Sequence, residues 1–275
     1  MVHARHDGGV RVGVVQFRSG EDKPDNLRRL RRLIDQAATE GADLVITPEA
    51  SMHSFGEGDE SLAPYAEPLD GPFVTGLAET ARDRGITVVS GMFEPVEDDV
   101  ARAYNTVVAI GPDGAMLGRY RKLHLFDALG WTESKQLVPG PMELLTFRCG
   151  ETTVGVLTCY DLRFPELSRA LVDAGATLLA LPSAWVAGPH KVDQWSSLVH
   201  ARAIENTAYV AGAAQPPPEY SGHSMVVDPF GVTVVRLGDD EGVAVAEVTE
   251  ARIAEVRERM PSLEHRRFEV FPKER

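Results

Sequence analysis

The sequence predicts an α/β fold in which two β-sheets pack together between layers of helices. Apolar strands alternate with amphipathic helices along the 275 residues, a pattern typical of sheets whose faces are covered by helices. Both halves of the chain contain a strand–helix–strand series and a turn-linked pair of strands. No linker rich in Pro, Gly or Ser separates the halves, because Pro216-Pro217-Pro218 is short enough to be a loop. We therefore expect one domain.

The first half begins with a valine-rich run, Val10 to Phe17, that predicts a buried strand. Asp25 to Glu40 predicts a helix, since leucine, isoleucine and alanine recur there at helical spacing while arginines occupy the other face. The next expected elements are a strand at Leu44–Thr47, a helix at Phe73–Arg84, a strand at Ile86–Phe93, and the strands Asn105–Ile110 and Ala115–Tyr120. A Gly-Pro-Asp-Gly turn joins the last two strands and predicts a hairpin.

The second half follows an irregular stretch from Lys122 to Pro141. Its expected elements are strands at Leu144–Arg148 and Thr152–Thr158, a helix at Phe164–Ala174, a strand at Leu178–Leu181, a helix at Val192–Asn206, a strand at Tyr209–Ala214, a second hairpin of Ser224–Val227 and Thr233–Arg236, a strand at Val243–Val248 and a helix at Thr249–Met260. We assign residues 1–9 to a flexible N-terminus, 10–260 to the domain and 261–275 to a C-terminal tail.

The composition excludes several classes of protein. A net charge of −13 argues against a general nucleic-acid binder or a protein that binds anionic membranes. No apolar run approaches the length of a membrane span, and Met1 to Gly9 has no apolar signal segment. Cys149 and Cys159 flank a predicted strand, which holds them beyond disulfide reach. Two free thiols suit a reducing compartment, so we expect a cytoplasmic protein.

Three polar residues follow predicted strands, where a ligand binds in many α/β sheets. Glu49 and Cys159 come just past buried strands, and Lys122 follows the strand of the first hairpin. A carboxylate, a thiol and an ammonium group together can form a covalent catalytic site. Each also has a structural alternative: Glu49 as a cap or surface pair, Cys159 as a small buried apolar residue, and Lys122 as a surface cation. Spacing alone does not establish that the three meet.

Three segments resemble the motifs of the nitrilase superfamily of carbon–nitrogen hydrolases, and the resemblance extends from Val10 to the tail. They are Pro48-Glu49-Ala50, Tyr120-Arg121-Lys122-Leu123-His124-Leu125-Phe126-Asp127 and Cys159-Tyr160-Asp161-Leu162-Arg163-Phe164-Pro165-Glu166. Two later stretches, 202–206 and 222–229, are most similar to the branch that contains omega-amidase and deaminated glutathione amidase. This resemblance implies a four-layer α-β-β-α sandwich that pairs into a homodimer and uses neither a metal nor an organic cofactor.

The resemblance also implies roles for individual residues. Cys159 is the nucleophile, Glu49 the general base and Lys122 the cation that stabilises the oxyanion, together with the backbone N–H of Tyr160. Glu133 matches the second glutamate of the family. The segment between Lys122 and Glu133 looks shorter than in animal amidases, and because it borders the pocket it bears on the identity of the substrate.

The implied substrate is a small amide that carries a carboxylate, of the omega-amide or deaminated-glutathione type. An N-carbamoyl compound or a nitrile would use the same catalytic residues and remains an alternative. The candidate substrate-binding residues are Trp185, His190 and Arg163, with Lys191 and Arg202 as further cations, and each of them also has a structural alternative.

Two other interpretations of the site remain open, and we also expect a homodimer. A papain-like Cys–His pair would use His124, His190, His200 or His223 as the base. A catalytically silent scaffold is the alternative from another class. Phe268 and Phe271 in the tail are expected to pack on a second subunit of the homodimer, unless the tail folds back on its own domain.

Overall fold

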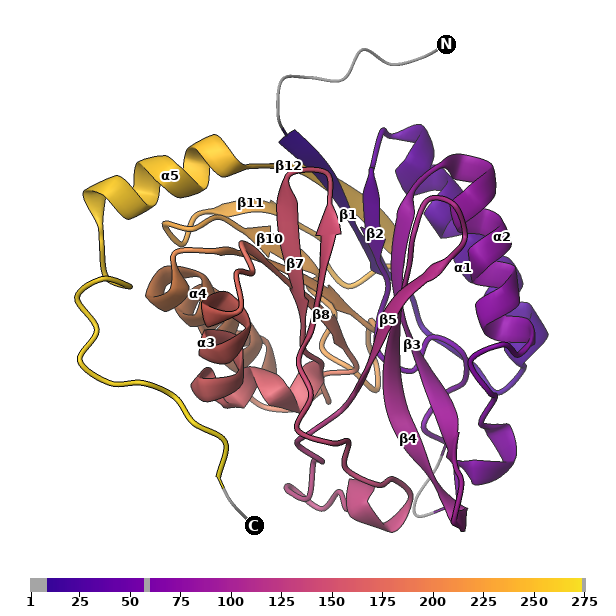
Figure 1. The fold of residues 1–275 in the computed structure, drawn as a ribbon. Helices are drawn as coiled ribbons and strands as arrows, with labels where there is room; N and C mark the ends of the chain where they lie inside the picture. Colours follow the sequence, from indigo (N-terminus) through magenta and orange to yellow (C-terminus); the bar gives the residue numbers. More distant parts are fainter. Residues whose placement is uncertain (1–8, 57–59, 274–275) are drawn as a thin grey trace.

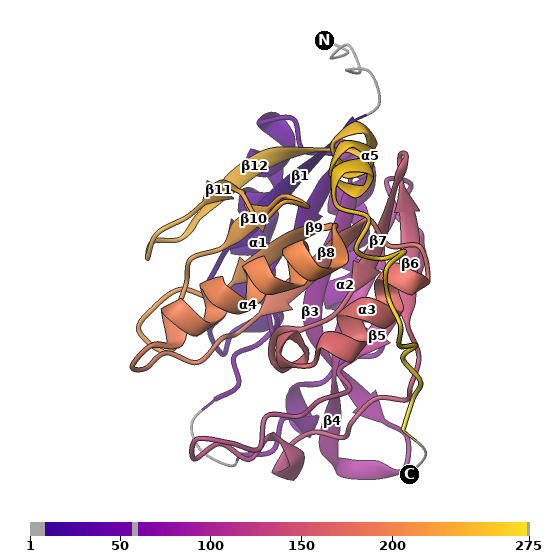
Figure 2. The same cartoon turned by 90° about the vertical axis from the view of Figure 1, so that its left-hand side faces the viewer.

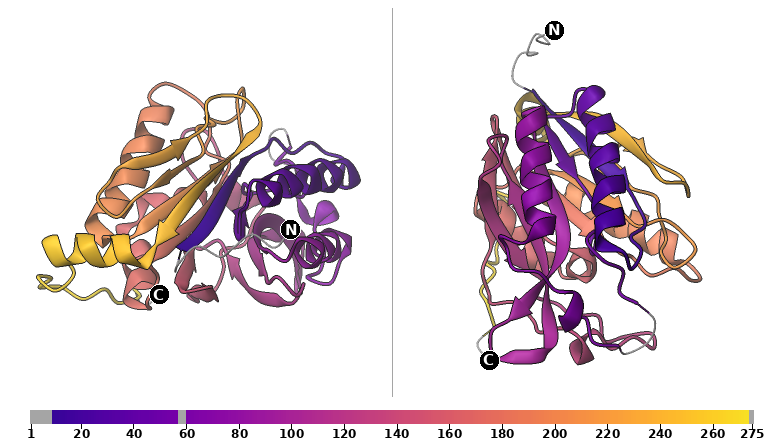
Figure 3. Two further views of the ribbon diagram at one scale, coloured as in Figure 1. Left: turned by 90° about the horizontal axis from the view of Figure 1, so that it is seen from above. Right: turned by 90° about the vertical axis from the view of Figure 1, so that its right-hand side faces the viewer.

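The computed structural model describes residues 9–56 and 60–273 (Figure 1). Two six-stranded sheets pack face to face, and helices cover their outer sides, so that the expected α-β-β-α sandwich is confirmed (Figures 1 and 3). Residues 1–8 of the predicted flexible N-terminus lie outside the described residues. Gly9, which we had placed with them, begins the first strand.

The first sheet has the strand order β12-β1-β2-β3-β4-β5. Its strands are β1 (Gly9–Gln16), β2 (Leu44–Ile46), β3 (Thr87–Val96), β4 (Asp99–Ile110), β5 (Met116–Arg121) and β12 (Gly242–Thr249). Helices α1 (Lys23–Thr39) and α2 (Pro72–Arg84) cover its outer face (Figure 3). A short 3₁₀ helix, η1 (Ala63–Tyr65), lies between β2 and α2 in the sequence.

The second sheet has the strand order β11-β10-β9-β8-β7-β6. Its strands are β6 (Leu145–Cys149), β7 (Thr152–Val156), β8 (Leu178–Ser183), β9 (Tyr209–Ala214), β10 (Met225–Val227) and β11 (Thr233–Arg236). Helices α3 (Pro165–Asp173) and α4 (Lys191–Asn206) cover its outer face, and α5 (Glu250–Arg259) follows β12 (Figure 2). The 3₁₀ helices η2 (Glu133–Lys135) and η3 (Cys159–Arg163) lie in the connections.

The two sheets share one topology. In the first, β1, β2 and β3 are parallel, β12 flanks them antiparallel to β1, and β4 and β5 continue antiparallel after β3. In the second, β7, β8 and β9 are parallel, β6 flanks them antiparallel to β7, and β10 and β11 continue after β9. The similarity of the two halves, which is weak in the sequence, is therefore clear in the strand pairing.

Local sequence signals explain where the helices begin and end. Asp22 caps α1 by accepting a hydrogen bond from the backbone N–H of Asp25 at 2.9 Å, and Pro24 lies in the first turn, where its missing N–H is not needed. Gly85 ends α2 in the left-handed conformation at φ 66°, which glycine adopts without steric penalty. Pro165 begins α3 in the same way as Pro24 begins α1.

The core follows from the alternation of side chains along the strands. On β2, Leu44 and Ile46 face the second sheet while Val45 faces α1 and α2, because successive side chains point to opposite faces. All three side chains are fully buried. Within the described part of the chain, no helix is both long and apolar enough to cross a membrane.

The structure differs from the sequence prediction in three places. β3 and β4 extend to Val96 and Asp99 and form a hairpin that we did not predict, because polar residues interrupt the apolar pattern there. The segment that begins at Cys159, to which the sequence pattern assigns no element, is a 3₁₀ helix. β12 returns to the first sheet beside β1, a long-range pairing that local patterns do not specify.

The C-terminal tail lies against its own domain over part of its length. Leu263 packs on the core, and Arg266 pairs with Asp173 at the end of α3. Phe268 and Phe271 are 87% and 74% exposed in the monomer. The folding-back alternative therefore holds for the first part of the tail, while packing of the two phenylalanines on a second subunit stays a prediction.

Candidate active site

Three strand ends bring the predicted catalytic residues together between the sheets. Glu49 lies three residues past the end of β2, Cys159 three residues past the end of β7, and Lys122 immediately after β5. All three side chains are buried. The backbone at Glu49 can approach β3 closely because Gly91 has no side chain: a Cβ there would lie 2.7 Å from the Glu49 Cα.

Lys122 joins the two glutamates. Its Nζ lies 2.9 Å from Glu49 Oε1 and 2.9 Å from both carboxylate oxygens of Glu133. Buried charges of this kind are tolerated only when they are paired and hydrogen-bonded. Lys122 is also fixed through its backbone, since its N–H donates to Asn105 and its carbonyl accepts from Gly140, each at 2.8 Å.

Glu49 is held by donors from both sheets. Its Oε1 also accepts from Asn105 Nδ2 at 2.7 Å, and its Oε2 accepts from the backbone N–H of Ala184, just past β8, at 2.7 Å. Gln215 Nε2 donates to the Glu49 carbonyl at 2.9 Å. Sequence reasoning missed Asn105, Ala184 and Gln215. An asparagine at the start of the otherwise apolar predicted strand 105–110 is the one signal that could have identified Asn105.

Glu133 is positioned by the irregular segment between β5 and β6. Its Oε2 accepts from the backbone N–H of Phe126 at 2.8 Å, in addition to both contacts with Lys122. The segment is tied to β4, where Ala103 exchanges hydrogen bonds with Gln136 and Val138. Glu133 therefore reaches the site from a segment that hydrogen bonds to the first sheet hold in place.

Cys159 opens the turn η3 with φ 46°, a left-handed conformation that is strained for a residue with a side chain. Thr158 and Asp161 form a reciprocal capping box around it. Asp161, fully buried, also accepts from the Tyr120 hydroxyl and from His124 Nδ1, each at 2.7 Å. The end of β5, which leads into Lys122, and the nucleophile turn are thereby held together.

The electrostatics of the site are dominated by burial and by these charges. Burial opposes the charge of Lys122, but Glu133, Glu49 and Cys159 together raise its pKa well above the usual lysine range. Burial, the charge of Glu49 and a hydrogen bond to that carboxylate raise the pKa of the Cys159 thiol well above its usual range, with Lys122 opposing them. Cys159 is therefore a protonated thiol next to a fixed proton acceptor.

Cys159 faces two adjoining cavities. The larger, about 220 Å³, is lined by Cys159, Glu133, Tyr220 and apolar or aromatic side chains that include Phe126 and Trp131. The smaller has about 10 Å³ of free volume and is lined by Phe126, Cys159, Tyr160, Arg163, Trp185, Val186 and Lys191. The site thus opens onto a mostly apolar chamber with a small basic extension.

The structure brings some of the predicted substrate-binding residues to this site and leaves others outside it. Trp185 and Arg163 line the small cavity, whereas the side chain of His190 is 82% exposed and lies 3.6 Å from Asp193. Its neighbour Lys191 points inward instead. Arg202 pairs with Glu205 at 2.8 Å and donates to the Leu162 carbonyl, which gives it a structural role.

The histidines of the papain-like alternative have other partners. His124 hydrogen-bonds Asp161, His200 bonds Ser196 and Thr233, His223 pairs with Asp239, and His190 lies at the surface. The charges that act on the Cys159 thiol come from Glu49, Lys122 and Glu133, with no histidine among them. The geometry therefore favours Glu49 as the base. Across residues 9–56 and 60–273, no cluster of three or more His, Cys, Asp or Glu residues could hold a metal ion.

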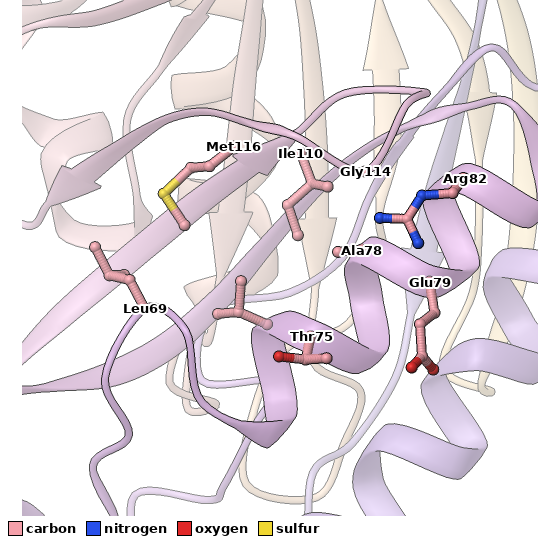
Figure 4. A pocket seen from close by; sticks show the side chains of 9 residues that line it. Leu69, Thr75, Ala78, Glu79, Arg82, Ile110, Gly114 and Met116 are labelled. Carbon is pink, nitrogen blue, oxygen red and sulfur yellow. The ribbon is translucent and has the colours of Figure 1, made fainter.

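A larger hollow lies away from this site. It measures about 300 Å³ between α2 and the β4–β5 hairpin, and Thr75, Ala78, Ile110 and Met116 are among its lining residues (Figure 4). Glu79 and Arg82 are its charged residues, and it contains no cysteine. We therefore place the chemistry at Cys159 although the larger volume is elsewhere.

Comparisons with known proteins identify the family of this chain. The family model described as carbon–nitrogen hydrolase matches residues 11–258. The chain is 37% identical to a deaminated glutathione amidase of Synechocystis over 94% of this chain and 98% of that protein. It is 36% identical to an omega-amidase of Danio rerio over 95% of this chain and 96% of that protein. Among solved structures, a double mutant of an amidase from Nesterenkonia in complex with acrylamide superposes with a TM-score of 0.79 at 26% identity, over 95% of this chain and 98% of that one.

Proposed function

The chain belongs to the carbon–nitrogen hydrolase family, and from this premise we propose that it is an amidase that hydrolyses a small linear amide through a thioester at Cys159. One observation carries the proposal: Lys122 Nζ joins the carboxylates of Glu49 and Glu133 at 2.9 Å in a buried site beside the Cys159 thiol. A silent scaffold does not need this arrangement, because two carboxylates and one ammonium group leave one negative charge unbalanced in a buried site, at a cost in stability that a scaffold has no reason to bear.

The acylation step begins with the protonated thiol. As the sulfur bonds to the amide carbon, the thiol proton passes to Glu49, the carboxylate that acts on the pKa of the thiol. Negative charge then develops on the carbonyl oxygen. Lys122 and the backbone N–H of Tyr160 stabilise it; Tyr160 lies in the first turn of η3, where N–H groups have no acceptor within the helix.

Collapse of this intermediate breaks the C–N bond. Glu49 returns its proton to the nitrogen, ammonia leaves from a primary amide or the corresponding amine from a secondary amide, and the acyl group remains on Cys159 as a thioester. A water molecule that gives its proton to Glu49 then attacks the thioester carbon. The acid departs and Glu49 returns the proton to the sulfur, which restores the thiol. Glu133 keeps Lys122 charged and oriented through two 2.9 Å contacts.

We propose that the substrate is an amide with a carboxylate at its other end, of the omega-amide or deaminated-glutathione type. The names of the two relatives support this class, and so does a 220 Å³ chamber, which suits a short chain better than a peptide. An N-carbamoyl compound or a nitrile would meet the same catalytic residues.

The test is product release by wild-type protein and by Cys159→Ala: ammonia from omega-amides, N-carbamoyl amino acids and nitriles, and cysteinylglycine from deaminated glutathione. The proposal predicts release from at least one omega-amide and none from the variant. Release from nitriles or N-carbamoyl compounds alone would replace the substrate class, and release that survives in Cys159→Ala would refute the mechanism.

We also propose a cytoplasmic homodimer. Two buried free thiols support the location. Exposed apolar side chains on α4 and near β11, together with Phe268 and Phe271, support the dimer; they include Ile204, Phe230, Val232 and Val234. Sedimentation that shows a monomer at micromolar concentration would contradict it.

A further inference from the structure

The small cavity beside Cys159 contains an unusual lysine. Lys191, the first residue of α4, is only 5% exposed, yet its side chain extends into the cavity that also contains the nucleophile. Its Nζ lies 4.6 Å from the ring of Trp185 and 5.4 Å from that of Phe126. Within the described residues, this ammonium group forms neither an ion pair nor a hydrogen bond with a protein acceptor.

A second cation shares the cavity. Arg163 lies in η3, between β7 and α3, and its guanidinium is 5.0 Å from the Trp185 ring. The guanidinium donates to the neutral side-chain oxygen of Gln194 at 2.6 Å. It too has no carboxylate partner in the part of the chain that the structure describes. Burial lowers the pKa of Lys191, and the nearby charge of Arg163 lowers it further.

Within the described residues, the lack of a carboxylate at Lys191 contrasts with the ion pairs of two other buried cations. Lys122 meets two carboxylates, and Arg202 pairs with Glu205. The chain has 41 acidic residues against 28 basic ones, yet across residues 9–56 and 60–273 no carboxylate pairs with Lys191. Lys191 is buried beside the partly exposed Arg163 and without an anion, which is unfavourable, so its counter-ion is expected to come from outside the protein.

We propose that Lys191, assisted by Arg163, binds a carboxylate of the substrate and thereby selects amides that carry a carboxylate over neutral amides of the same length. This inference rests on the proposed amidase function and identifies the residue that recognises the carboxylate of the substrate. The small cavity has about 10 Å³ of free volume, room for roughly one water-sized group. Only one oxygen of the terminal carboxylate enters it, while the rest of the substrate occupies the larger chamber that meets it at Cys159.

The binding mode follows from the chemistry of the two groups. The ammonium of Lys191 supplies a point charge, and the guanidinium of Arg163 supplies a planar donor array. The aromatic rings of Trp185 and Phe126 hold the ammonium in the cavity while it is unoccupied by an anion. Lys191 and Arg163 are therefore specificity residues, separate from the Glu49–Lys122–Glu133 group that performs the chemistry.

The test compares matched substrates in the full chain. Succinamate and glutaramate carry the carboxylate, and butyramide and valeramide replace it with a methyl group. In Lys191→Met we expect KM for the acidic amides to rise roughly 10- to 100-fold, as for a lost hydrogen bond to a charged group, with kcat and the rates on neutral amides unchanged. Arg163→Met should act in the same direction. Lys23→Met is the control. It removes a lysine that pairs with Glu67 and is distant in the sequence from Lys191.

Two readouts separate this inference from a merely structural role. Since Met is apolar and similar in length, Lys191→Met should raise Tm by removing an unpaired buried charge, whereas loss of a structural lysine would lower Tm. Succinate should raise Tm of the wild type and not of Lys191→Met.

Equal losses on acidic and neutral amides, or succinate stabilisation that persists in Lys191→Met, would overturn the inference and leave the amidase proposal intact. If the wild type cleaves no amide yet binds succinate through Lys191, the amidase proposal fails and the anion site stands.

Discussion

Replacing Glu49 by Gln should change catalysis and thiol reactivity in opposite directions. The side chain keeps its shape but loses its charge and its ability to accept a proton. Loss of a general base lowers rates by roughly 10²- to 10⁴-fold, so ammonia release should fall by that factor. The charge of Glu49 helps to raise the pKa of the Cys159 thiol, so its removal should lower that pKa and speed alkylation near neutral pH.

The same substitution should destabilise the fold by a limited amount. Oε1 accepts from Lys122 and Asn105, and Oε2 accepts from the Ala184 N–H, so every neighbour of the carboxylate is a donor. In Glu49→Gln the new NH₂ group faces one of these donors. One buried clash of donors costs about 1–3 kcal/mol, which should appear as a lower midpoint in urea.

The assays are ammonia release, the rate of Cys159 alkylation by iodoacetamide against pH, and urea unfolding. Glu67→Gln is the matched control, because Glu67 is also buried, pairs with a lysine at 2.7 Å and accepts a backbone N–H from Phe73 at 2.9 Å. It should lose similar stability and keep full activity. Undiminished ammonia release by Glu49→Gln would refute its assignment as the base.

Other substitutions and conditions give further expected outcomes. Gly91→Ala should reduce activity strongly and stability by about 1–3 kcal/mol, since its Cβ would lie 2.6 Å from the Ala50 N and displace Glu49; a fully active variant would contradict this. Cys149→Ala should keep ammonia release, because that thiol lies in the core beside Thr87; loss of activity without unfolding would show otherwise. The folded-state pKa of Cys159 is raised, mainly by burial, so the stability that this protonated thiol contributes should be complete below the ordinary thiol pKa of about 8.5 and decline as pH rises above it. A Cys159→Ala variant should lack this part of the alkaline decline in urea titrations, and an unchanged pH profile would exclude the contribution.

The sequence predicted the order of strands and helices because local patterns determine them. Valine-rich runs, helical spacing and the turn residues at Gly85 and in the two hairpins placed these elements within about three residues of their observed bounds, except that β4 begins at Asp99 and not at Asn105. The pairing of β12 with β1 was not predicted, since it joins residues more than two hundred positions apart and leaves no local signal.

The candidate site was predicted in part. Glu49, Lys122, Cys159 and Glu133 stood out through strand ends and through resemblance to family motifs, and the structure places all four around one point. The groups that hold them were not found, because a backbone N–H such as that of Ala184 has no sequence signature. His190 was preferred to Lys191 by type alone. The start of α4 turns His190 to the surface and Lys191 inward, a difference of one residue that periodicity near a helix end does not resolve.

The covalent role of Cys159 is tested most directly by trapping the acyl-enzyme. Wild-type protein is mixed with its best amide substrate and quenched in acid within one turnover. The mass of the intact protein is then measured, and the modified peptide is identified by peptide mass mapping. The account predicts an added mass equal to the amide minus ammonia, on the peptide that contains Cys159 and absent from Cys159→Ala. An adduct on another residue, or ammonia release by Cys159→Ala at the wild-type rate, would contradict it.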